Sequence, residues 1–100
     1  MTDLEISRAL ALAIGWKPEQ MRESRLRNGE LLVQSGDEYF ARLFNYRDWN
    51  VIGPIAARYN CFPDFSTFYT HWRAIDKFSV VHVADTPQKA IAMAVIGSAK

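Results

Sequence analysis

The chain has 100 residues and a mass of 11.5 kDa, a length that allows one hydrophobic core and therefore predicts a single domain over residues 1–100. Its composition is 49% hydrophobic, 13% aromatic and 23% charged, which excludes intrinsic disorder as the main state. The net charge of +1 excludes an acidic mimic of nucleic acid and gives no support to a strongly basic binder. We expect a soluble, cytoplasmic protein without an export signal, because no apolar run approaches the ~20 residues of a membrane-spanning helix and Cys61 is the only cysteine.

The opening segment predicts a helix over residues 3–14. Thr2 and Glu5 have the spacing of a capping box, in which the hydroxyl and the carboxylate each bond a free backbone N–H group. Apolar residues then recur every three or four positions and form one stripe. Gly15 is suited to the left-handed residue that ends a helix, after which Trp16 can fold back onto the stripe.

A polar segment and then a hairpin follow the first helix. Residues 17–30 are polar and mixed in sign, and we expect a loop or irregular arm there. Two short apolar and aromatic runs, residues 31–34 and 39–44, flank Ser35-Gly36-Asp37 and predict a β-hairpin.

A second helix is expected from Asp48, whose side chain can cap it, to the neighbourhood of Asn60. Pro54 lies inside this segment and removes one backbone hydrogen bond. The proline should therefore kink the helix or shift its start toward Gly53.

Two further β-rich runs predict a second hairpin around Asp76-Lys77, namely Thr67 to Ile75 and Phe78 to Ala84. Thr86 and Pro87 then have the residue types expected at the N-cap and the first position of a last helix.

These segments predict an α+β domain with the order α-β-β-α-β-β-α. We expect a two- or three-layer sandwich in which one antiparallel sheet of about four strands is covered by the helices Thr2–Ile14 and Thr86–Ser98. No internal repeat, linker or low-complexity tract is visible.

Three stretches, which together cover about half of the chain, are similar to segments of known proteins. They are Glu5 to Trp16, Phe44 to Asp48 leading to Pro54 to Tyr59, and Asp85 to Ala94. They resemble small proteins of tailed phages and prophages, of the phage ABA-sandwich type, whose function is mostly unassigned. The resemblance implies an α/β sandwich and a phage or prophage origin, and it supplies no catalytic residue. Relatives tend to have a bulky residue where Gly53 stands, and their strand region is more variable.

Two histidines require a geometric test. If Asp76-Lys77 were a two-residue turn, His71 would lie opposite His82 on one sheet face, close enough to share a transition metal. Asp-Lys is not a favoured pair for such a turn, and no third ligand is evident beyond Asp64 or Cys61. We therefore expect two histidines on a solvated or helix-covered strand, with no metal site and no cofactor.

The sequence offers no positive sign of catalysis. Cys61 follows the second predicted helix, far from a helix start that would lower the pKa of its thiol, and we expect it to be a buried structural residue. No glycine-rich phosphate loop, nucleophile elbow or paired-carboxylate motif is present. We predict no catalytic residue and no enzyme activity.

A basic cluster could contact the phosphates of a nucleic acid. It comprises Lys17, Arg22, Arg25 and Arg27, with three glutamates interleaved. Because these opposite charges nearly cancel, a solvated loop is the favoured interpretation and nucleic-acid binding is disfavoured.

Aromatic residues are concentrated in the middle of the chain, where residues 39–72 hold eleven of the thirteen. Alternating strands must point some of them outward, and Tyr, Trp and Arg dominate the energetics of protein interfaces. We therefore predict an interaction surface made of Tyr46, Trp49, Tyr69, Trp72, Arg73 and Arg42. The competing interpretation is that these aromatics fill a thin core.

The function predicted from these observations is that of a small phage- or prophage-encoded, non-enzymatic accessory protein that binds a host or phage protein. An inhibitor of a bacterial defence system, such as an anti-CRISPR, is a concrete form of this prediction and rests on the resemblance. Two alternatives remain open: a self-associating homodimer built on the same aromatic face, and a small nucleic-acid-binding regulator that uses residues 17–27. No membrane partner is expected.

Overall fold

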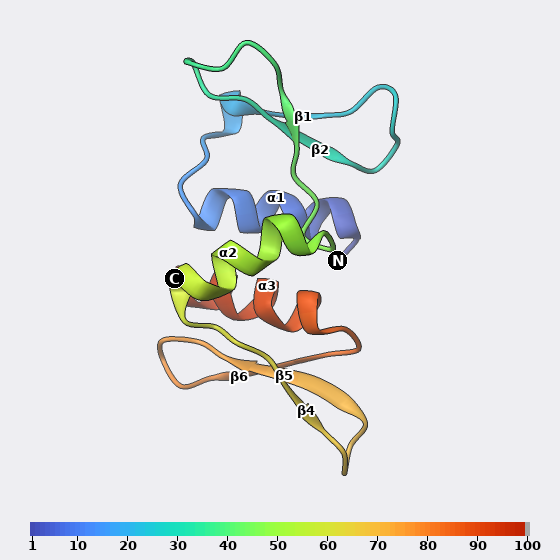
Figure 1. Cartoon of the computed structure of the whole chain (residues 1–100), viewed down its shortest axis with the longest axis vertical. Helices are drawn as coiled ribbons and strands as arrows, with labels where there is room; N and C mark the ends of the chain where they lie inside the picture. Colours follow the sequence, from blue (N-terminus) through green and yellow to red (C-terminus); the bar gives the residue numbers. More distant parts are fainter. Residues whose placement is uncertain (100) are drawn as a thin grey trace.

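The computed structural model describes residues 1–99 as helices and two three-stranded antiparallel sheets (Figure 1). The helices are α1 (Asp3–Ala13), α2 (Trp49–Tyr59) and α3 (Pro87–Ser98), with a short 3-10 helix η1 (Pro18–Gln20). One sheet, sheet A, contains β1 (Met21–Glu23), β2 (Leu31–Val33) and β3 (Arg42–Leu43), and the other, sheet B, contains β4 (Asp64–Ser66), β5 (His71–Ile75) and β6 (Val81–Ala84). The predicted α+β class is confirmed, but the single sheet of about four strands and its element order are wrong, because each predicted hairpin is part of a separate three-stranded sheet.

The predicted ends of α1 are confirmed by its capping bonds. The Glu5 N–H donates to the Thr2 hydroxyl at 3.2 Å, and the Thr2 N–H donates to the Glu5 carboxylate at 3.3 Å. At the other end Gly15 has a φ of +112°, and the Trp16 N–H donates to the Ala11 carbonyl at 3.0 Å. This left-handed turn packs Trp16 against the core and ends the helix.

Sheet A corrects the prediction that residues 17–30 form a loop. β1 pairs with β2, and Met21 lies opposite Val33, both of them buried. One buried apolar residue is sufficient to hold β1 on the core, because the neighbouring strand β2 contributes the other buried residues of the same sheet, Leu31 and Val33. The predicted antiparallel pairing of β2 with β3 is confirmed, with Leu32 opposite Leu43, but β3 is shorter than the predicted run 39–44 because residues 39–41 belong to the irregular connection.

Helix α2 begins at the predicted cap, where the Asp48 carboxylate accepts a hydrogen bond from the Asn50 N–H at 2.9 Å. It ends at Asn60, which is left-handed with a φ of 54°. The predicted shift of its start toward Gly53 is wrong, because the helix continues through Pro54, and the alternative of a kink at Pro54 stays a prediction. Gly53 precedes the proline and has no Cβ, which removes one of the two clashes that disfavour helical backbone before a proline.

Sheet B contains a strand that the sequence pattern did not predict. β4 pairs with β5, so that Phe65 lies opposite Trp72. β5 in turn pairs with β6 around Ala74 and His82. The connection between β5 and β6 is longer than a two-residue turn, because the Asp76 N–H donates to the Val80 carbonyl at 3.0 Å and closes a five-residue loop.

Helix α3 lies at the centre of the molecule and begins at the predicted cap, Thr86. It packs against α1 and α2 on one side and against β5 and β6 on the other, while α1 lies against β2 (Figure 1). The prediction that α1 and α3 cover a common sheet is therefore wrong. The buried residues of α3 are mostly small, which allows close approach on both sides: Ala90, Ile91, Ala92, Ala94, Val95 and Ser98.

The molecule is elongated, with principal extents of 46 × 25 × 21 Å. Sheets A and B lie at opposite ends of the long axis, with the helices between them (Figure 1). No helix within residues 1–99 is long and apolar enough to cross a membrane.

Candidate protein-interaction surface

The six residues predicted for an interaction surface do not form one surface. Tyr46 is only 3% exposed, which corrects its placement on the surface. Its hydroxyl donates to the Asp3 carboxylate at 2.7 Å, and its N–H donates to the Ser7 hydroxyl at 3.2 Å. These bonds hold the chain that enters α2 against α1, so Tyr46 is part of the core.

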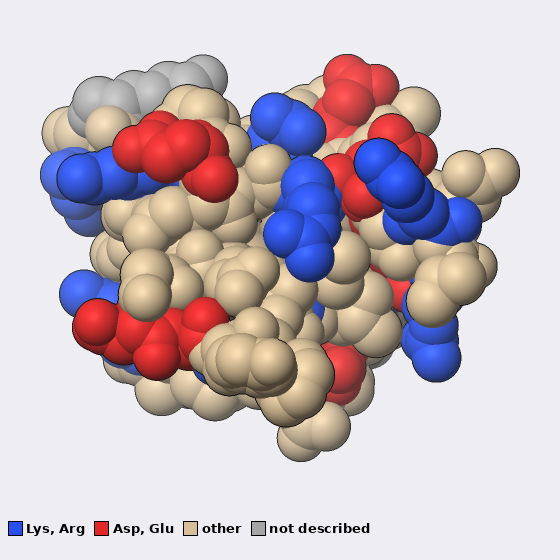
Figure 2. Space-filling model, turned by 90° about the horizontal axis from the view of Figure 1, so that it is seen from above, with Lys and Arg blue, Asp and Glu red and all other residues tan. Residues whose placement is uncertain are grey.

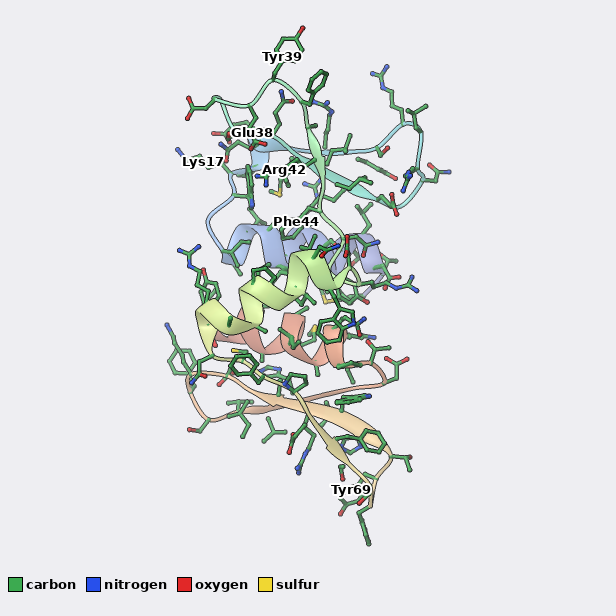
Figure 3. All side chains as sticks on the ribbon, in the orientation of Figure 1. Lys17, Glu38, Tyr39, Arg42, Phe44 and Tyr69 are labelled. Atoms are coloured by element: carbon green, nitrogen blue, oxygen red, sulfur yellow. The ribbon has the colours of Figure 1, made fainter. Side chains whose placement is uncertain are left out.

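Two more of the predicted residues are exposed but lie elsewhere. Arg42 belongs to sheet A, where its guanidinium lies 2.8 Å from the Glu38 carboxylate and 5.8 Å from the ring centre of Trp16. Trp49 is the first residue of α2 and is 51% exposed. Arg42 and Tyr69 are toward opposite ends of the molecule in Figure 3, so a single partner surface does not include both.

The other three predicted residues, Tyr69, Trp72 and Arg73, lie together on one hairpin, residues 64–75, which we call the β4–β5 hairpin. Arg73 forms an ion pair with Asp64 on the neighbouring strand at 2.7 Å. On the opposite sheet face, the rings of Phe65 and Trp72 are 5.2 Å apart and tilted by 58°, and Trp72 packs against the core. Both strand faces therefore hold the two strands together.

The tip of the β4–β5 hairpin presents two exposed aromatic side chains. Phe68 is 84% exposed and Tyr69 is 66% exposed, and their rings meet edge to face at 4.8 Å. Tyr69 also stacks on His71 at 5.5 Å with an interplanar angle of 13°. Figure 3 shows Tyr69 projecting away from the body of the protein.

The backbone of this tip is bonded to its own side chains. The Tyr69 N–H donates to the Ser66 hydroxyl at 3.3 Å, and Thr70 has a positive φ of 53° that reverses the chain. Phe68 and His71 were not among the predicted site residues, because aromatic residues are not typical of turns and the whole segment from Thr67 resembled one strand. The hydroxyl residues around the tip, Ser66, Thr67 and Thr70, were the available sign of a turn.

A second pair of exposed aromatics contains Tyr39, which lies at the other end of the molecule (Figure 3), and the adjacent Phe40. The two rings are 4.7 Å apart, with Tyr39 87% exposed and Phe40 76% exposed. They are part of the irregular connection from β2 to β3, whereas the tip of the β4–β5 hairpin joins two paired strands. The hairpin tip is therefore the better supported of the two aromatic sites.

The two histidines do not face one another. His71 lies opposite Ser66, and His82 lies opposite Ala74, because the five-residue loop displaces the register that a two-residue turn would give. Within residues 1–99, no group of three or more His, Cys, Asp and Glu side chains could hold a metal ion.

His82 instead bonds to a buried carboxylate, with its Nε2 2.8 Å from an oxygen of Asp76. The other carboxylate oxygen accepts from the N–H groups of Phe78 and Val80, at 2.8 and 3.0 Å. The His82 hydrogen bond lowers the pKa of Asp76, with further lowering by the two backbone donors. This cluster shapes the β5–β6 loop.

Cys61 is buried, as predicted, with 1% of its surface exposed. Its thiol donates to the Tyr59 carbonyl at 3.3 Å, and burial raises the pKa of the thiol. Burial and the raised pKa of the thiol are features of a structural cysteine and not of a nucleophilic one.

Two of the four basic residues of the 17–27 segment contact an acidic or polar side chain. Arg27 lies 3.7 Å from Glu30, and Arg22 donates to the Gln34 side chain at 3.4 Å. Acidic and basic side chains are interspersed on the face that Figure 2 shows. This face carries no single-sign field of the kind that would attract nucleic acid.

No family model, curated protein or solved structure matches this chain. The residues of the β4–β5 hairpin are therefore the basis for assigning a function.

Proposed function

We propose that this protein is a non-enzymatic accessory protein that binds another protein through the tip of the β4–β5 hairpin. The observation that supports this most is the edge-to-face pair of Phe68 and Tyr69, which is exposed at the end of a hairpin fixed on both faces. Exposed aromatics on a projecting element are typical of interaction sites.

The physical basis of this proposal is preorganisation. Aromatic anchors commonly contribute about 2 kcal/mol or more to a protein interface when they enter a partner pocket. Tyr69 is held by its stacking on His71, so binding would restrict little additional side-chain freedom. The expected partner surface has an apolar pocket for these rings, with polar groups that meet the nearby Asp64–Arg73 pair.

The partner we propose is a host or phage protein in the bacterial cytoplasm. This part of the proposal is supported by the resemblance of the helices and their caps to small phage proteins. Inhibition of a bacterial defence system, in the manner of an anti-CRISPR, is the specific activity that we propose for such an accessory protein.

An affinity pull-down from phage-infected bacterial cells, with this chain as bait, tests the proposal. We expect Tyr69→Ala to lose the captured protein and Tyr39→Ala to retain it, since Tyr39 is an even more exposed tyrosine but lies at the opposite end. Trp72→Ala is a poorer test because Trp72 packs against the core. Equal capture by wild type and Tyr69→Ala would contradict the proposal.

A further inference from the structure

Sheet B has two edge strands, β4 and β6, and no strand within residues 1–99 pairs with the free side of β6. The strand order β4-β5-β6 leaves β6 at the edge, and residues 80–84 read Val-Val-His-Val-Ala, with no charged residue and no proline. Edge strands of monomeric proteins usually carry charges, prolines or bulges that prevent pairing with another chain. β6 lacks these protective features.

The backbone of β6 is oriented for pairing. The Asp76 N–H donates to the Val80 carbonyl at 3.0 Å, and Ala74 lies opposite His82 in the same register. Hydrogen-bonded pairs alternate along an antiparallel ladder, so His82 directs its backbone groups toward β5. The N–H and C=O groups of Val81 and Val83 therefore point toward the open edge.

The side chains of the same two residues form an apolar strip on the outer face of sheet B. Ala74 and Ala84 are buried against the helices, so the alternate residues face outward. Val81 is 50% exposed, Val83 is 54% exposed, and Ile75, which lies opposite Val81, is 55% exposed. If another strand paired with β6 in a register that keeps the same face outward, this apolar strip would continue onto that strand.

We infer that two copies of this chain pair antiparallel along β6 and form a continuous six-stranded sheet. In the register that matches all four valines, Val81 of each copy lies opposite Val83 of the other, and His82 lies on the twofold axis. This register keeps the outward faces on the same side and joins the open N–H and C=O groups of both valines. The inference does not depend on the proposed binding function.

Charges at the two ends of β6 favour a second copy over an unrelated extended peptide. Exposed Lys77 precedes the strand and exposed Asp85 follows it. Antiparallel self-pairing brings Lys77 of each copy toward Asp85 of the other, whereas parallel pairing would place like charges together. The strand is thus complementary to itself in backbone, side-chain face and charge.

Sedimentation equilibrium or light scattering of the full chain, from about 1 to 200 μM, tests the inference. We expect the wild type to dimerise in this range and Val83→Pro to stay monomeric, because the proline removes an N–H that points to the open edge and not one that bonds to β5. Circular dichroism checks that the variant is folded. The matched control is Ile75→Thr, which alters the same sheet face on the central strand and should still dimerise.

A charge exchange provides a second arm that does not depend on proline. Lys77→Glu alone should weaken dimerisation by about twofold to tenfold, because each dimer contains two such pairs, and Lys77→Glu combined with Asp85→Lys should restore it. Amide exchange gives the direct signature: the Val83 amide should become protected as concentration rises, while the His82 amide is protected throughout. A wild type that is monomeric at 200 μM, or a dimer that survives Val83→Pro and is lost in Ile75→Thr, would overturn the inference.

Discussion

At the scale of single residues, one buried hydroxyl joins the start of α1 to the chain that enters α2. The Tyr46 hydroxyl donates to one oxygen of Asp3, and the Arg47 guanidinium lies 3.1 Å from the other. The Tyr46 hydrogen bond lowers the pKa of Asp3, and burial together with the Asp3 carboxylate raises the pKa of Tyr46. Since the folded state lowers the pKa of Asp3, this bond stabilises the fold above the ordinary aspartate value of about 3.9 and its contribution is lost as the pH falls below it.

Tyr46→Phe is expected to destabilise the protein by about 1 kcal/mol, because it removes a hydrogen bond to a carboxylate that is partly exposed to water. Urea unfolding at pH 7 and at pH 3 measures the effect. The difference between variant and wild type should shrink as the pH falls toward the lowered pKa of Asp3, because protonation removes the carboxylate charge that strengthens the bond. A difference of equal size at both values would contradict the assignment.

Gly97 in α3 occupies a position that has no room for a side chain. A Cβ there would lie 2.7 Å from both the Asp76 carboxylate and the His82 ring. Helix propensity alone favours Gly97→Ala by about 1 kcal/mol, whereas overpacking costs about 1–3 kcal/mol. We expect the steric effect to dominate and the melting temperature to fall, and a higher melting temperature would show that the Asp76–His82 cluster yields easily.

At the scale of helices and strands, the helices could be predicted because their signals are local. The caps Thr2, Asp48 and Thr86 lie within a few residues of the groups they satisfy. Strands β1 and β4 could not be predicted, because each contains a single apolar residue, Met21 and Phe65, and one such residue makes no hydrophobic run. Their stability depends on pairing with residues further along the chain.

The candidate site was predictable only in part, for a related reason. Composition identifies Tyr46 and Tyr69 as aromatics of the same segment, but only the tertiary arrangement buries one and exposes the other. Tyr69, Trp72 and Arg73 lie together because Thr70 reverses the chain with a positive φ, a turn that the sequence pattern did not reveal. The register of His71 and His82 likewise depended on the length of one loop.

Gly15 ends α1 through its left-handed conformation, and substitution of this glycine tests how much the helix end contributes to stability. Gly15→Ala should cost about 1–2 kcal/mol, since a Cβ is strained at a φ of +112°. Gly36→Ala is the matched control, because Gly36 is not left-handed and a Cβ there meets nothing within 4 Å. Denaturant midpoints for the two variants should differ clearly, and equal midpoints would refute the role of Gly15.

At the scale of the whole molecule, α3 is the common support of α1, α2 and sheet B, while sheet A is attached mainly through the contact of β2 with α1. The strands of sheet A contain only two or three residues, and Leu43 is 41% exposed. The two ends of the long axis are therefore expected to differ in local stability (Figure 1).

Native-state hydrogen exchange measures this difference residue by residue. Amides of α3 should exchange only through global unfolding, whereas amides of sheet A should exchange through local opening with a smaller free energy. A single free energy of opening for Ile91 in α3 and Leu32 in sheet A would show that the two ends unfold together.

The central claim is that the tip of the β4–β5 hairpin binds the partner protein. Its most direct test is the affinity of the purified partner for wild type, Tyr69→Ala and Tyr39→Ala by isothermal titration calorimetry. We expect Tyr69→Ala to weaken binding by about thirtyfold or more, the loss of one interface anchor of about 2 kcal/mol, and Tyr39→Ala to leave it unchanged. Equal affinities of wild type and Tyr69→Ala, or a loss confined to Tyr39→Ala, would contradict the claim.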